Sequence, residues 1–391
     1  MAGLHRRPSR LGCAALHHSR SGVSMRQLLL SLMLLVPAAL GALDPATAAE
    51  RRKVIIDQDA LGGPGLQPII LLLQDPDVEV LGITIVSGDG WQPEETAATL
   101  RMLELIGRTD VPVHAGATFP LVNSKARNAR REAMYGALAY RGAWTDQWPA
   151  DDTMNRRAAH APDVIPPLAV GLPTTRAAAG SAADFMLEMS RKYPGQVSII
   201  AMGPLTNLAL AQRLDDGFAA RIKEVVTEGG SFLGNDLSAK QGVFANQTAY
   251  APRMSFNFVW DPEAAHIVFT SPWPRLTMVT GDAADPAIAT QALLDRATAS
   301  GSAAARYVKR TAQAGFPLWD EVEAIAWLDP AAVTKAGPLS IDIDLTQGAN
   351  YGALVTWPAG KGPGLGEQPV NVVYAMDVPR VDDIFVSHIG K

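Results

Sequence analysis

Cysteine is almost absent from this sequence of 391 residues, which contains only Cys13. That residue lies in an N-terminal stretch that we expect to be removed from the mature protein. A mature chain without cysteine has no disulfide, no thiolate metal ligand and no cysteine nucleophile.

Charge is also scarce, at 19% of residues with a formal net charge of −5. Nucleic-acid binding needs clustered lysine and arginine, and the sequence has no basic stripe or long block of one sign. We therefore expect no nucleic-acid partner, and nothing points to a protein partner. A hydrophobic content of 48% is typical of a well-buried globular protein.

One apolar run stands near the N-terminus, at residues 28–40, directly after Arg26. Small residues follow it at 46–49. A basic residue, an apolar segment and an A-x-A site together indicate a signal peptide. We predict a leader at residues 1–49 and an exported protein, either periplasmic or secreted.

The same run is short for a membrane span of about 20 residues and is interrupted by Ser31 and Pro37. We therefore expect no stable membrane span after cleavage, although an uncleaved anchor is the alternative. The basic stretch before Met25 is either a long n-region or the result of a start codon placed too early.

Short apolar runs alternate with helical patterns through the rest of the chain, which we predict to form one domain at residues 50–391. Helical patterns occupy 69–74 and 93–106. The predicted strands lie at 53–57, 78–86, 111–113, 196–201, 223–227 and 275–279. This alternation predicts an α/β fold with a mostly parallel central sheet flanked by helices and a Rossmann-like core. In such sheets ligands bind at the carboxyl ends of the strands.

Two regions depart from this rhythm. Residues 123–176 are too long for an ordinary connection, so they form either a lid or an elaborated surface loop. After Gly337 the pattern favours β segments at 354–357 and 370–376, with a final helix near 382–389.

Carboxylates follow the first predicted strand, in Asp57-Gln58-Asp59. Two carboxylates aimed at one point suit a hard cation such as Ca²⁺ or Mg²⁺. An equally simple explanation of these carboxylates is that they cap a turn by accepting hydrogen bonds from nearby backbone N–H groups. A phosphatase with Asp57 as nucleophile is a third, but its usual Thr or Val after the second Asp is replaced here by Ala60-Leu61.

Four later segments occur in an order typical of one family. They are Val80-Leu81-Gly82-Ile83-Thr84-Ile85-Val86-Ser87-Gly88-Asp89, then Ala201-Met202-Gly203-Pro204-Leu205-Thr206-Asn207-Leu208-Ala209, then Ser255-Phe256-Asn257 with Trp260-Asp261-Pro262-Glu263-Ala264-Ala265, and finally Leu318-Trp319-Asp320. From Lys53 onward the chain resembles the inosine/uridine-preferring nucleoside hydrolases.

The resemblance implies the family's fold and a metal site. Ca²⁺ would be held by Asp57, Asp59, Asp320 and the backbone carbonyl of Met202, and Asp59 would also be the general base. The metal would hold sugar hydroxyls and lower the pKa of a water, which attacks the anomeric carbon. A small nucleoside or ribosyl substrate is implied, and self-association into a homo-oligomer is possible.

Substrate contacts are implied at Asn257, which matches a sugar-binding Asn, and at Asp89, which replaces the usual Asn. Trp319 stands where the family carries a His that can protonate the leaving base. Each motif also has an ordinary structural explanation. Asn257 could be a buried amide and Asp320 a helix cap, and we expect Asp261 to cap a helix outside the site.

The loop after Asp59 lacks the two further Asp residues of the family signature D-x-D-P-G-x-D-D. Gln67 could supply one neutral oxygen, and Asp89 could restore negative charge from the other side of the cavity. Ser255 stands where a sugar-binding Glu is frequent. An aromatic wall for the base could come from Trp319, Trp260, Phe258 and Trp91.

These observations favour an exported metal-dependent N-ribohydrolase that cleaves nucleosides or related N-glycosides. The missing Asp pair leaves a second interpretation open, a catalytically impaired nucleoside- or sugar-binding protein on the same fold.

Overall fold

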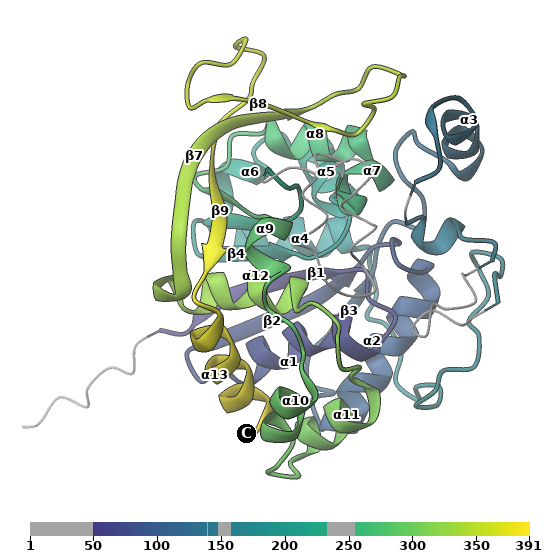
Figure 1. Ribbon diagram of the computed structural model, residues 1–391, viewed down its shortest axis with the longest axis vertical. Helices are drawn as coiled ribbons and strands as arrows, with labels where there is room; N and C mark the ends of the chain where they lie inside the picture. The colour runs from purple at the N-terminus through teal and green to yellow at the C-terminus, as the bar shows by residue number, and fades with distance from the viewer. Residues whose placement is uncertain (1–49, 139, 148–157, 233–254) are drawn as a thin grey trace, which may run out of the picture. The chain divides into compact units, whose positions relative to one another are not determined.

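The core is one nine-stranded sheet in the order β3-β2-β1-β4-β5-β6-β9-β7-β8 (Figure 1). The computed structural model describes residues 50–138, 140–147, 158–232 and 255–391. The strands are β1 Arg52–Gln58, β2 Val78–Ile85, β3 Val113–Ala115, β4 Val197–Ala201, β5 Glu224–Glu228, β6 Leu276–Val279, β7 Val333–Ile343, β8 Leu354–Pro358 and β9 Pro369–Met376.

Helices fill most of the connections. They are α1 Gln67–Gln74, α2 Gln92–Ile106, α3 Lys125–Tyr135, α4 Ala182–Lys192, α5 Thr206–Leu214, α6 Phe218–Arg221, α7 Phe256–Trp260, α8 Pro262–Phe269, α9 Gly281–Ala284, α10 Gln291–Ala297, α11 Ala303–Thr311, α12 Trp319–Leu328 and α13 Val378–Ile389. Short 3₁₀ helices occur at η1 Gly63–Leu66, η2 Gly142–Trp144 and η4 Pro330–Ala332.

Seven neighbouring strands, β3 to β9 in sheet order, pair in parallel, while β7 is antiparallel to both β9 and β8. The prediction of a mostly parallel α/β sheet is confirmed. The third strand was predicted two residues too early, since Val111 precedes β3. The last helix begins at Val378 rather than near residue 382, because Asp377 accepts a hydrogen bond from the Arg380 amide and caps it.

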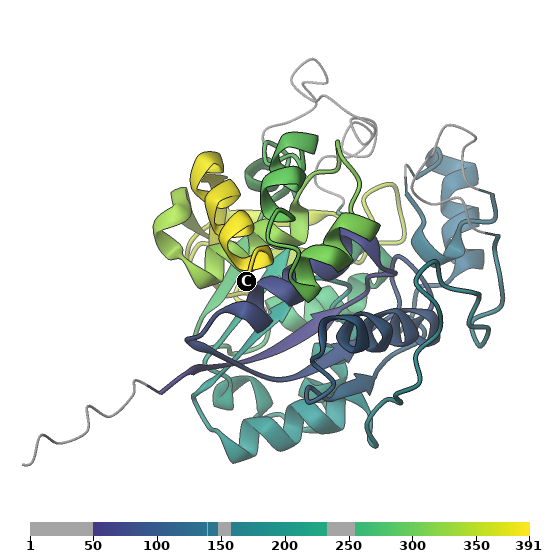
Figure 2. The same ribbon diagram turned by 90° about the horizontal axis from the view of Figure 1, so that it is seen from below.

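Two hydrophobic cores form because successive side chains of a strand point to opposite faces. In β1, Val54 and Ile56 pack into one core and Ile55 packs into the other. The first core also contains residues of α1, α2 and α9–α13, and the second contains residues of α4–α8. Figure 2 shows α1 and the green and yellow helices on one side of the sheet and the teal helices on the other. The sheet is thus covered on both faces, as parallel sheets require.

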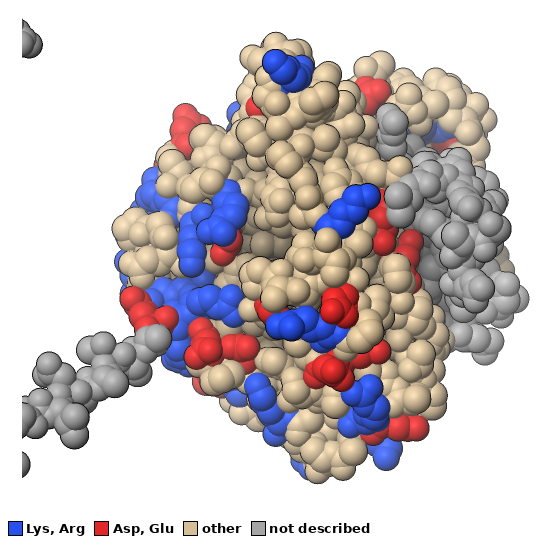
Figure 3. Space-filling model, turned by 60° about the vertical axis from the view of Figure 1, so that its left-hand side comes forward, with Lys and Arg blue, Asp and Glu red and all other residues tan. Residues whose placement is uncertain are grey.

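The surface carries mixed charge on the face drawn in Figure 3, where basic and acidic side chains lie close to one another. In the part of the chain that the structure describes, none of the helices combines the length and the apolar character needed to cross a bilayer. The predicted leader at residues 1–49 lies outside the described residues, so it stays a prediction.

Candidate active site

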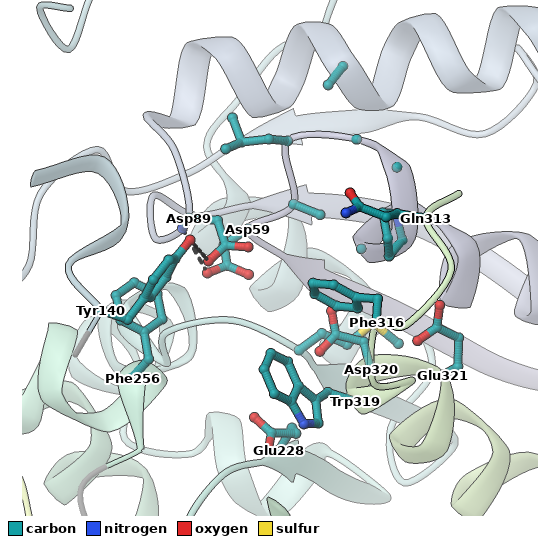
Figure 4. A pocket seen from close by; sticks show the side chains of 18 of the residues that line it. Asp59, Asp89, Tyr140, Glu228, Phe256, Gln313, Phe316, Trp319, Asp320 and Glu321 are labelled. Atoms are coloured by element: carbon teal, nitrogen blue, oxygen red, sulfur yellow. Dashed lines mark hydrogen bonds between the residues drawn. The ribbon is translucent and has the colours of Figure 1, made fainter. Parts of the chain in front are cut away.

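A cavity of about 610 Å³ opens at the carboxyl ends of the parallel strands. It is lined by six of the seven residues that the sequence singled out: Asp59, Asp89, Met202, Asn257, Trp319 and Asp320. These residues come from five separate parts of the chain, and Figure 4 shows the labelled side chains around one space. The strand-end argument therefore located the pocket correctly.

Asp57, the seventh residue, is fully buried and is not among the residues that line the cavity. Its Oδ1 accepts hydrogen bonds from Thr84 Oγ1 at 2.6 Å and Asn207 Nδ2 at 2.8 Å. No donor among the described residues contacts its Oδ2. Burial raises the pKa of Asp57 to about 7 against the effect of these two hydrogen bonds. This position favours a supporting role behind Asp59.

Asp59 is wedged between two glycines. A Cβ atom on Gly88 would lie 1.9 Å from Asp59 Oδ2, and one on Gly203 would lie 2.7 Å from its Cγ. The amide of Asp89 donates a hydrogen bond to Asp59 Oδ2 at 3.2 Å. Burial raises the pKa of Asp59 well above its usual range, and the charges of Asp89 and Asp320 add to this. The carboxylate is therefore held in one place in an acidic surrounding.

Asp89 joins the cavity wall at the end of the segment that follows β2. Its Oδ1 accepts a hydrogen bond from the Tyr140 hydroxyl at 2.9 Å, drawn as a dashed line in Figure 4. Tyr140 packs edge-on against Phe256 at 4.8 Å between ring centroids. Tyr140 and residues 166–170 belong to the long irregular region, which supplies part of the cavity wall.

Asn257 connects two strand ends. Its Nδ2 donates to the Met202 carbonyl at 3.1 Å and lies 3.3 Å from Glu228 Oε2. Asn257 is thus a buried amide that also lines the cavity, so its two interpretations from the sequence are compatible. The Met202 carbonyl faces this corner and has a second lone pair for another partner.

Asp320 lies in the first turn of α12, next to Trp319. Burial and the charge of Asp89 raise the pKa of Asp320 to about 8, although a hydrogen bond from Gln58 lowers it. Trp319 Nε1 donates to Asp285 Oδ1 at 2.8 Å, and its ring meets Phe316 edge-on at 5.4 Å. The indole is therefore held in the wall by a polar contact and an aromatic contact.

Three of the four residues of the predicted aromatic wall are absent from the lining. Trp91 and Trp260 pack with Trp144 in a separate cluster, and Phe258 is buried in the second hydrophobic core. Their aromatic character reflects packing, as is usual for large rings near a core. The aromatic side chains that do line the cavity are Tyr140, Phe256, Tyr307, Phe316 and Trp319.

The loop after Asp59 lines the cavity from Ala60 to Gly65 and contributes no carboxylate there. Gln67 does not line the cavity; it is the first residue of α1 and is 1% exposed. Its Oε1 has no hydrogen-bond partner among the described residues, so an oxygen donated by Gln67 stays a prediction. Asp261 caps α8 through Ala264 N at 3.1 Å and lies outside the lining, as expected.

Sequence reasoning missed Glu228, the last residue of β5, and Asp285, which follows α9. Both line the cavity. Burial, Asp320 and Asp285 raise the pKa of Glu228 well above its usual range. The strand-end rule that singled out Asp89 applies equally to Glu228, so a signal was present. Asp285 had no such signal, because it follows a four-residue helix.

The donor set in the cavity consists of hard oxygen atoms. Asp59, Asp320 and the Met202 carbonyl are of the kind that binds Ca²⁺ or Mg²⁺, and Asp57 Oδ2 behind them has no described partner. Mutual repulsion among these acids is what a cation would relieve. No cluster of three or more acidic or histidine side chains at metal-ligand spacing occurs within the described ranges. The residues fit a hard divalent cation held by two carboxylates and a carbonyl.

Comparison with known proteins identifies the family of the chain. Residues 54–383 match the family model described as inosine-uridine preferring nucleoside hydrolase. Uridine nucleosidase 1 of Arabidopsis thaliana is 30% identical over 88% of this chain and 94% of its own length. The inosine-uridine preferring nucleoside hydrolase of Crithidia fasciculata is 29% identical over 78% of this chain and 87% of its own.

Solved structures show the same fold. A plant nucleoside hydrolase superposes with a TM-score of 0.67 at 23% identity, and covers 87% of this chain and 99% of its own. The purine-preferring ribonucleoside hydrolase from Gardnerella vaginalis gives 0.66 at 20% identity, with 87% and 98% covered. The chain belongs to the inosine-uridine preferring nucleoside hydrolase family, whose members cleave N-glycosidic bonds.

Proposed function

We propose that this chain is an exported N-ribohydrolase that uses Ca²⁺ to cleave nucleosides, or related N-glycosides, into sugar and base. The observation that carries the proposal is the cavity itself. It brings Asp59, Asn257, Asp320 and the Met202 carbonyl to one place at the strand ends. The family is metal-dependent, and the oxygen donors of this cavity are the kind that Ca²⁺ prefers.

Asp59 is the group that would take a proton from the attacking water, because it lies in the cavity with its carboxylate fixed by Gly88 and Gly203. Asp89 and Asn257 line the same cavity and can hydrogen-bond sugar hydroxyls. Asp59, Asp320 and the Met202 carbonyl would hold the cation. A bound divalent cation would supply positive charge and Lewis acidity.

Departure of the base has no evident acid at position 319. The indole N–H of Trp319 is a donor only, and it is directed to Asp285 at 2.8 Å. Trp319 and Phe316 instead present aromatic surface to the cavity. We infer that stacking against these rings stabilises the leaving base.

A binding protein without turnover is the second candidate. The observation that favours it is the loop from Ala60 to Gly65, which brings no carboxylate to the cavity. A phosphatase is disfavoured, because a nucleophile must reach its substrate and Asp57 does not line the cavity. The cavity also holds several acids, which would repel an anionic phosphate ester.

The test uses the chain from residue 50 to 391. We expect calorimetry to show Ca²⁺ binding that is lost in both Asp59→Asn and Asp320→Asn, and ribose release from uridine or inosine that EDTA stops. The carboxylate of Asp383 is exposed and outside the cavity, so Asp383→Asn is the matched control. Nucleoside binding without ribose release would favour the binding protein, and absence of Ca²⁺ binding by the wild type would overturn the metal-dependent mechanism.

Export is proposed from the leader pattern alone. Expression of the full sequence in a Gram-negative host should give a product whose N-terminus follows the small residues at 46–49. Intact-mass measurement of the secreted or periplasmic fraction checks this, and a cytoplasmic product that retains residues 1–49 would contradict it.

A further inference from the structure

Ser255, the N-cap residue of α7, lines one corner of the cavity. Its hydroxyl packs against the residue that follows β5, since a Cβ atom on Gly229 would lie 2.6 Å from Ser255 Oγ. The Ser255 side chain is short and carries no charge. The residue before Gly229 is Glu228, which lines the same corner.

The position of Glu228 follows from the sheet. Glu228 pairs with Val279 of β6 and is the last residue of β5, so it stands at the edge where the cavity opens. Its Oε2 lies 3.3 Å from Asn257 Nδ2, and its backbone carbonyl lies 3.5 Å from the same atom. Glu228, Ser255 and Asn257 therefore form one polar corner. Figure 4 shows Glu228 beside Trp319 and below Asp320.

A structural explanation for Glu228 is weak. Its electrostatic neighbours are the acids Asp320 and Asp285, and within the described residues no ion pair with lysine or arginine is formed. Ionised carboxylates close together in a buried corner repel one another, and a polar ligand that hydrogen-bonds them offsets part of this cost. By contrast, Glu224 at the other end of the same strand pairs with Arg275 at 3.2 Å.

We propose that Glu228 binds a hydroxyl group of the sugar from the end of β5. Its carboxyl oxygens accept hydrogen bonds from hydroxyl groups, and Asn257 fixes one of them from the side. The ligand is a neutral polyol, and its identity as a ribosyl group rests on the function proposed above. Glu228 is thus a substrate-binding residue that sets preference for the hydroxylated sugar.

The experiment compares uridine with 2′-deoxyuridine, 3′-deoxyuridine and 5′-deoxyuridine at saturating Ca²⁺. We expect Glu228→Ala to lower kcat/KM for uridine by about tenfold, the order expected for the loss of one buried hydrogen bond. Glu228→Gln should lower kcat/KM for uridine by less, because the glutamine amide can still form a hydrogen bond with a hydroxyl group. For one of the three deoxynucleosides, the loss caused by Glu228→Ala should shrink to about twofold or less, because the hydroxyl is already missing.

Two further variants sharpen the result. Glu228→Ala with Ser255→Glu should regain part of the lost kcat/KM, since the acid then returns from α7. Glu188→Gln, an exposed residue of α4 away from the cavity, is the matched control and should leave all four substrates unchanged. An equal loss on all four substrates would overturn the proposal, because Glu228 would then act only by shaping the site.

Measurements of nucleoside binding test the role of Glu228 independently of the proposed hydrolysis. If the wild type releases no ribose, calorimetry with the same four nucleosides still measures how each sugar hydroxyl contributes to affinity. A loss of affinity in Glu228→Ala that vanishes for one deoxynucleoside supports the role of Glu228 even though hydrolysis has failed. Binding of none of the four nucleosides by the wild type would overturn it.

Discussion

Glycine has a specific role on both sides of Asp59. Gly88 follows β2 and Gly203 follows β4, and a methyl group on either would overlap the Asp59 side chain. The Asp59 side chain is close to both glycines, so a methyl group at either position would have to displace it. These two positions therefore fix where the proton acceptor stands.

We expect Gly88→Ala and Gly203→Ala each to lower kcat/KM by about a hundredfold, because a displacement near 1 Å of a reacting group has effects of that order. Overpacking should also lower the free energy of unfolding by about 1–3 kcal/mol. Gly337→Ala in β7 is the control, since the added methyl group would lie 3.9 Å from its nearest neighbour, the Tyr374 ring of β9. Steady-state kinetics with a urea titration checks this, and unchanged kcat/KM in both variants would show that Asp59 is not held as described.

Buried Asp261 makes stability depend on pH. Its carboxylate accepts hydrogen bonds from Leu121 N at 2.9 Å, Thr206 Oγ1 at 2.8 Å and Ala264 N at 3.1 Å. Burial nevertheless dominates and raises the pKa to about 6. Between pH 4 and 6 the folded chain therefore binds a proton that the unfolded chain releases, so ionisation destabilises the fold as pH rises.

Asp261 changes the free energy of unfolding by at most about 1.4 kcal/mol per pH unit. We expect Asp261→Asn, which cannot ionise, to gain stability relative to the wild type as pH rises from about 4 to about 6. Urea unfolding at several pH values measures this difference. A difference that stays constant over the range would contradict the assigned pKa.

At the scale of elements, α2 anchors the irregular segment that closes one side of the cavity. Arg101 Nε donates to the Val170 carbonyl at 3.0 Å, and Glu104 accepts hydrogen bonds from the amides of Thr174 and Thr175 at 2.6 and 2.7 Å. Val170 lines the cavity, whereas Arg101 does not. The helix thus positions a wall without contacting the ligand.

We expect Arg101→Met to raise KM for nucleosides severalfold and to change kcat by less than about twofold, because loss of binding that is uniform between ground and transition state appears in KM. Arg108→Met is the control. It removes a comparable bond to a backbone carbonyl, Leu73 at 2.9 Å, outside the cavity. A fall in kcat alone would indicate that residues 166–170 act on the chemical step.

At the scale of the whole molecule, the end of the chain completes the sheet. Strand β9 is inserted between β6 and β7, with Thr277 opposite Asn371. Phe385 and Ile389 of α13 belong to the same core as Val54 of β1. The first and last described elements therefore stabilise each other.

We expect the chain 50–391 to unfold in one cooperative thermal transition and a chain 50–328 to lack a fixed tertiary structure. The shorter chain exposes the edge of β6 and loses the core contacts of α13. Near-UV circular dichroism distinguishes the two. A native-like near-UV spectrum from the shorter chain would show that the rest of the fold forms without β7–β9 and α13.

Much of the fold followed from local pattern. Apolar runs such as 53–57 and 196–201 predicted buried parallel strands, and their ends at Asp59, Asp89 and Met202 predicted the position of the cavity. Chain connectivity gives these results because parallel strands joined by helices must all end at the same edge. Asp261 as a helix cap followed from its local sequence with Pro262.

Other features depended on contacts between distant parts of the chain. Trp260 and Trp319 have the same side chain, yet one packs against Trp144 and the other lines the cavity. Asp57 and Asp59 differ by two positions, and only Asp59 reaches the cavity, because Thr84 and Asn207 bind Asp57 from behind. The sequence by itself determined the family, the sheet and the edge that binds ligand. Only the tertiary structure decided which acids face the ligand, since burial and neighbouring groups from other strands select among them.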